Sequence, residues 1–131
     1  MAKTKGFSGI RPGAIKEFTP DMYIEEGKEK TGAEPVFSLT YPSISEKQSI
    51  YDRFYEGNRI AKGQTGACFE AVIRPHVKGM RNVPAAFEMD DQKHLVSAVY
   101  DMFDFDLRGA LFSEIMTGGE PTDEETNGVK L

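Results

Sequence analysis

The sequence contains few of the residues that form covalent or metal cross-links. It has one cysteine, Cys68, and two histidines among 131 residues. A single thiol cannot form a disulfide within the chain, and one thiol with two imidazoles does not supply the four ligands of a structural zinc site. Because no other motif indicates a bound ion or coenzyme, we expect no metal and no cofactor.

Long hydrophobic runs are also missing. No apolar stretch approaches the roughly 18 residues that cross a bilayer. The lysines at the N-terminus are not followed by the apolar segment of about 7–15 residues that a secretory signal needs. With 39% hydrophobic and 28% charged residues, the composition is typical of a soluble globular chain of one domain. We expect a cytoplasmic protein that makes no membrane contact.

Tryptophan is absent, and positive charge is in deficit. The 16 lysines and arginines are outnumbered by 21 aspartates and glutamates, which gives a formal net charge of -5. Binding to a phosphate backbone requires a stripe of basic side chains that displaces counterions. The charge balance therefore argues against nucleic acid as the partner.

The two ends of the chain carry opposite charges. Four basic residues and no acidic ones occur in the first sixteen positions, namely Lys3, Lys5, Arg11 and Lys16. The last dozen positions include Glu120, Asp123, Glu124 and Glu125. Glycine and proline interrupt both segments. We predict a flexible basic arm over 1–14, one globular domain over 15–118 and a flexible acidic tail over 119–131. A solvated arm is favoured over a phosphate or partner contact.

The first part of the domain has the pattern of strands. Over residues 35–41, Phe37, Leu39 and Tyr41 alternate with polar residues, which is the period of a half-buried strand. A second extended segment, 17–24, contains a proline that would place it at an edge or a turn. Together they predict a hairpin or a small antiparallel sheet.

A helix is predicted to begin directly after this sheet. Ser43 with Glu46, and Ser45 with Gln48, form two overlapping capping boxes. Gly57 is suited to the position after the helix end. The expected inward face consists of Ile50, Tyr51, Phe54 and Tyr55.

Residues 64–83 are harder to interpret. The segment 67–73 fits a buried helical turn or a short strand, and we favour the helix. Pro75 and Gly79 are expected to break it, and 81–84 to form an extended connector.

Two helices are predicted in the last part of the domain. Asp90 or Asp91 can cap the first, whose apolar stripe is Leu95, Val96, Val99, Met102 and Phe103. Asp104, Phe105 and Asp106 then form a kink or a new cap. The second stripe is Leu107, Ala110, Leu111, Ile115 and Met116. The predicted fold class is therefore α+β, mostly helical, with a small N-terminal antiparallel sheet or hairpin.

Catalytic chemistry is not indicated. Cys68 and His76 could form a nucleophile and base, but eight residues and Pro75 separate them and no third orienting group is implied. With Phe69 and Val72 beside it, Cys68 is better explained as core packing. We predict that the protein is not an enzyme.

The abundant aromatic and methionine residues indicate a binding surface. Nine phenylalanines, five tyrosines and six methionines are present, and several crowd residues 100–105. Some of these side chains must face outward in either helical phase, although core packing alone is the alternative. The predicted partner surface consists of Tyr100, Phe103, Phe105, Leu107 and Phe112. Phe105, between two aspartates, is the member least expected in the core.

Three segments in this order resemble the tail assembly chaperones of long-tailed bacteriophages. The strand and Ser-capped helix start at 35–43 is followed by the connector 77–83, which leads into an acidic-capped stretch. A pair of short helices then ends at 114–118, before the acidic segment 122–127. The resemblance covers about residues 15–127. The aromatic residue that often follows the connector in this family is absent here.

The resemblance implies a small, mostly helical protein of the host cytoplasm with no catalytic residues. Such chaperones bind the long helical tape measure protein and shield its apolar segments during tail assembly, without staying in the virion. A structural virion component, such as a head–tail connector or a tail terminator, is the alternative. A regulatory or nucleic-acid-binding protein that uses the basic arm is a third hypothesis, and homo-oligomer formation stays open.

Overall fold

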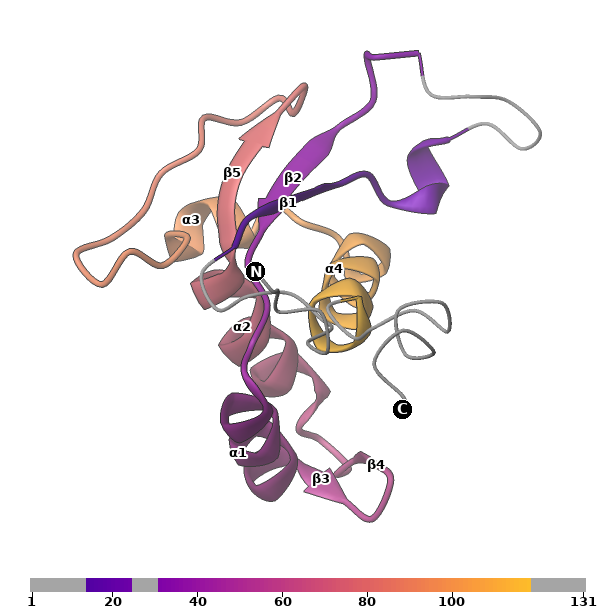
Figure 1. Cartoon of the computed structure of the whole chain (residues 1–131), viewed down its shortest axis with the longest axis vertical. Helices are drawn as coiled ribbons and strands as arrows, with labels where there is room; N and C mark the ends of the chain where they lie inside the picture. Colours follow the sequence, from indigo (N-terminus) through magenta and orange to yellow (C-terminus); the bar gives the residue numbers. More distant parts are fainter. Residues whose placement is uncertain (1–13, 25–30, 119–131) are drawn as a thin grey trace, which may run out of the picture.

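The computed structural model describes residues 14–24 and 31–118 (Figure 1). The elements in chain order are β1 (Lys16–Phe18), the 3-10 helix η1 (Asp21–Tyr23), β2 (Val36–Leu39), α1 (Ile44–Phe54), β3 (Tyr55–Glu56), β4 (Arg59–Ile60), α2 (Thr65–His76), β5 (Val77–Arg81), α3 (Ser97–Tyr100) and α4 (Phe105–Thr117). The predicted α+β class is confirmed. The predicted acidic tail, and the predicted basic arm except residue 14, lie outside the described residues.

The sheet has three antiparallel strands in the order β1-β2-β5. The predicted small antiparallel sheet is confirmed, with Phe18 of β1 opposite Phe37 of β2. The first predicted extended segment, 17–24, is a strand only as far as Phe18, because Asp21–Tyr23 forms η1. Phe37 and Leu39 are fully buried, while Val36 and Ser38 on the other face are half-buried, as the period-two pattern requires. The third strand, β5, occupies part of what the sequence predicted as a connector.

Helix α1 begins at the first of the two predicted capping boxes. The amide of Glu46 donates to Ser43 Oγ at 3.1 Å, and the amide of Ser43 donates to Glu46 Oε1 at 2.8 Å. Its predicted inward face is wrong at Tyr51, which is 40% exposed, because α1 buries little beyond Phe54. Gly57, with a φ of 68°, lies in the turn between β3 and β4 instead of ending the helix.

Helix α2 confirms the favoured interpretation of residues 67–73 and extends beyond it. Its buried side chains are Cys68, Phe69, Val72 and Ile73. Pro75 does not break the helix, which continues to His76. Because Pro75 is the next-to-last residue, it removes a single hydrogen bond from the final turn, and the chain leaves at once into β5.

The long helix predicted from Asp90 or Asp91 is wrong, because α3 holds only four residues. The Asp90 carboxylate instead accepts from the amides of Gln92 at 2.8 Å and His94 at 3.1 Å, which closes a turn. The Leu95 amide donates to the Arg74 carbonyl of α2, so this segment pairs with α2 before α3 begins. Leu95, Val99 and Phe103 of the predicted stripe still reach the core, whereas Met102 does not.

Helix α4 begins at the predicted new cap, where the Leu107 amide donates to Asp104 Oδ1 at 2.8 Å. Its buried face consists of Leu107, Leu111, Phe112, Ile115 and Met116. In Figure 1, α2 and α4 lie together at the lower end of the sheet, and α1 extends away with the β3–β4 hairpin. The core occupies the space between α2, α4 and the buried face of β2.

Candidate functional site

The structure separates the five residues of the predicted partner surface. Tyr100, Phe103, Leu107 and Phe112 are buried, with exposed fractions of 2%, 4%, 6% and 9%. Phe105 is 68% exposed, as its position between two aspartates predicted. The five side chains therefore do not form one exposed face. Tyr100 is buried on α3, Phe103 in the turn after it, and Leu107 and Phe112 on the inner face of α4.

Phe105 is the first residue of α4, and it rests on a layer of buried rings. Its ring stacks on Phe69 of α2, with centroids 5.8 Å apart and an interplanar angle of 30°. Phe69 in turn lies 4.7 Å from the ring of Phe112. One face of Phe105 is thus supported while the rest of the side chain meets solvent.

Met102 adds a second apolar side chain to this turn. It is 61% exposed and lies three residues before Phe105. Its spacing predicted a place on the inward stripe of a long helix, which does not form. We call the exposed side chains of Met102 and Phe105 the α3–α4 patch.

The residues that flank this patch are acidic and exposed, namely Asp101, Asp104 and Asp106. Within the part of the chain that the structure describes, no basic side chain forms an ion pair with them. Burial and the negative charge of Asp104 raise the pKa of the Tyr23 phenol in η1. The patch is therefore apolar at its centre and negative at its rim.

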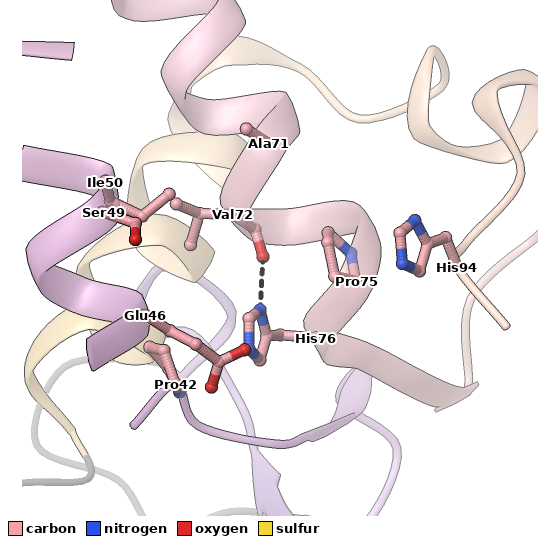
Figure 2. A pocket seen from close by; sticks show the side chains of 9 residues that line it. All are labelled: Pro42, Glu46, Ser49, Ile50, Ala71, Val72, Pro75, His76 and His94. Atoms are coloured by element: carbon pink, nitrogen blue, oxygen red, sulfur yellow. Dashed lines mark hydrogen bonds between the residues drawn. The ribbon is translucent and has the colours of Figure 1, made fainter. Parts of the chain in front are cut away.

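A second feature is a cavity of about 330 Å³ between α1 and α2 (Figure 2). Its apolar lining includes Ile50 and Ala71, and Pro75 lies between the two imidazoles of His76 and His94 in the view. A neighbouring hollow of about 410 Å³ shares Ala71, Pro75 and His94 with this cavity. Its lining carries charges of both signs, from Arg53, Glu70 and Arg74. This region is a groove of mixed character.

The titratable groups near the groove are engaged in structural contacts. The His76 ring makes a 2.9 Å hydrogen bond from Nδ1 to the Val72 carbonyl, and burial lowers the pKa of this imidazole. The Cys68 side chain has no exposed surface, and burial raises the pKa of its thiol to about 11. The thiol is protonated at neutral pH, so in this conformation it is a core residue and not a nucleophile.

The described residues offer two further negative findings. In 14–24 and 31–118, no three histidine, cysteine, aspartate or glutamate side chains gather closely enough to hold a metal ion. No helix in these ranges is long and apolar enough to span a membrane. The α3–α4 patch leaves two apolar side chains in contact with solvent.

Comparison of the chain with protein-family models, with curated proteins and with solved structures gives no match in any of the three. The functional interpretation therefore depends on the residues of the patch and on the resemblance of the three sequence segments.

Proposed function

We propose that this protein is a tail assembly chaperone of a long-tailed bacteriophage. It binds the tape measure protein in the host cytoplasm and shields apolar helical segments of that protein until the tail tube assembles around it. Two lines support the proposal, the segments that resemble the family and the exposed apolar patch. The exposure of Phe105 is the single observation that carries it.

An exposed phenylalanine on a rigid support has the properties of a binding anchor. The stack on Phe69 restricts the ring of Phe105 before any partner arrives, which lowers the entropy lost on binding. A desolvated aromatic anchor contributes about 2 kcal/mol or more to an interface. Met102, a flexible side chain, can adapt to apolar residues of different shapes, as repeated contacts along a long partner require.

The function is tested by producing the tape measure protein of the same phage in bacteria, with and without this chain. We expect the partner to be soluble and to co-purify when the chain is present, and to aggregate when it is absent. Equal solubility in both cultures would contradict the proposal.

Mass spectrometry of purified virions separates this function from the structural alternative. A chaperone is released, so its peptides should be absent from the mature particle. Recovery of the chain at the stoichiometry of a ring would instead identify a connector or a terminator.

A further inference from the structure

The acidic rim of the α3–α4 patch exceeds what helix formation requires. Asp104 caps α4 through the Leu107 amide, and Asp106 lies in the first turn of α4, where the helix dipole favours a carboxylate. Asp101 instead follows the last residue of α3, an end at which a negative charge gains nothing from the helix. Helix capping and the helix dipole therefore do not account for the charge of Asp101.

The basic residue of α4, Arg108, packs on Tyr100. The guanidinium of Arg108 lies over the ring of Tyr100, 4.2 Å from its centroid. It also donates from Nη2 to the Tyr100 carbonyl at 3.2 Å. Among the described residues, Arg108 forms no ion pair with the three carboxylates, which outnumber this one cation beside Met102 and Phe105.

We infer that the α3–α4 patch selects a helix whose apolar stripe is flanked by lysine or arginine. This inference rests on the proposed function, because it specifies the chemistry of the partner at the same surface. Apolar residues of the partner helix cover Met102 and Phe105, while its basic side chains face the carboxylates of the rim. The charges speed association and exclude acidic helices, and the apolar contact holds the complex together.

The groove between α1 and α2 has no such preference. Its charged lining residues include Glu46 and Glu70 as well as Arg53 and Arg74, and the last of these forms an ion pair with Glu70 at 3.0 Å. Charge complementarity therefore assigns the basic helix to the α3–α4 patch.

The test uses two fluorescent helical peptides of about 20 residues with the same leucine stripe. Lysine and arginine flank the stripe in one peptide, and glutamate flanks it in the other. Binding to the full chain is followed by fluorescence anisotropy. At low salt we expect the basic peptide to bind at least about 10-fold more tightly than the acidic one, with the ratio falling as salt screens the charges.

Variants locate the effect. The double substitution Asp101→Asn and Asp106→Asn removes two charges of the rim and leaves the Asp104 cap in place. We expect it to reduce the preference for the basic peptide to about 3-fold or less, whereas Glu56→Gln, an exposed acid on β3, keeps the full preference. Phe105→Ala should weaken binding of the basic peptide. Circular dichroism checks that each variant is folded, and the salt series on the unaltered chain requires no variant.

Several outcomes overturn the inference. The inference is wrong if the two peptides bind equally or if neither binds. It is also wrong if the double variant keeps the full preference for the basic peptide, or if Glu56→Gln reduces that preference as much as the double variant does. Failure of the proposed function is distinguished separately, because it is measured by the solubility of the tape measure protein. A chain that keeps that protein soluble and shows no preference for charge is a chaperone with a different recognition rule.

Discussion

At the residue scale, Phe103 and Phe105 show what a local pattern can predict. Both belong to the crowded aromatic segment, yet one is 4% exposed and the other 68%. The two aspartates beside Phe105 predicted its exposure. The burial of Phe103 depends on Phe37 of β2, whose ring meets it edge-on at 5.8 Å. That contact joins residues 66 positions apart, and no sequence window contains it.

Cys68→Ser should lower the free energy of unfolding at pH 7 by about 1–3 kcal/mol, because it places a hydroxyl in a fully buried apolar site. The ordinary pKa of the thiol is 9.0, and the fold raises it to about 11. Between these values the unfolded chain loses its thiol proton first, so the thiol's contribution to wild-type stability falls as the pH rises.

The difference in stability between wild type and Cys68→Ser should therefore shrink from pH 7 to pH 10, since serine does not ionise there. Urea unfolding at the two pH values measures it. A fully stable serine variant at pH 7, or a difference that grows with pH, would show that Cys68 is not packed as described.

At the element scale, the sequence predicted where helices α1 and α4 begin. It did not predict the segments whose conformation depends on pairing with distant parts of the chain. The caps at Ser43 and Asp104 are local and were found from the sequence. Strand β5 was not predicted, because its extended conformation comes from pairing with β2, a distant segment. The two strands are close at Gly79, where an added Cβ would lie only 3.2 Å from Ser38 Oγ. The prediction of a long helix before α3 is wrong because the Leu95 amide donates to the Arg74 carbonyl of α2 and not to a carbonyl of its own segment.

The two overlapping capping boxes provide an internal control at this scale. Ser43→Ala should lower the free energy of unfolding by about 1 kcal/mol, because it leaves the Glu46 amide without its partner. Ser45→Ala also removes a serine hydroxyl, but from a residue inside the first turn of α1. It should therefore change the free energy of unfolding by less than about 0.5 kcal/mol. Urea unfolding of both variants decides between the boxes. Equal losses of stability, or a larger loss for Ser45→Ala, would show that Ser43 is not the cap of α1.

At the scale of the whole molecule, α2 connects the two surfaces that could receive a partner. Phe69 supports the ring of Phe105, and Ala71, two residues later, lines the groove against α1. The sequence predicted an apolar partner surface near the C-terminal helices but drew it too broadly. It could not show which rings the turn between α3 and α4 would turn inward, because that depends on how α4 packs against α2.

In the proposed complex Phe105 anchors the partner, and a matched pair of variants tests this role. Ile44 is a suitable control, because it too is the first residue of a helix after a cap and is 86% exposed. Phe105→Ala should lose about 1 kcal/mol of stability from the stack on Phe69 and remain folded.

The decisive measurement is the amount of tape measure protein recovered with each tagged variant. A loss of about 2 kcal/mol corresponds to roughly 30-fold weaker binding. We predict that Phe105→Ala recovers little partner, whereas Ile44→Ala recovers as much as wild type. If a folded Phe105→Ala protein recovers as much partner as wild type, Phe105 is not the anchor, and the helix that carries Tyr51 and Tyr55 is the next candidate surface. If Phe105→Ala unfolds, Phe105 belongs to the core.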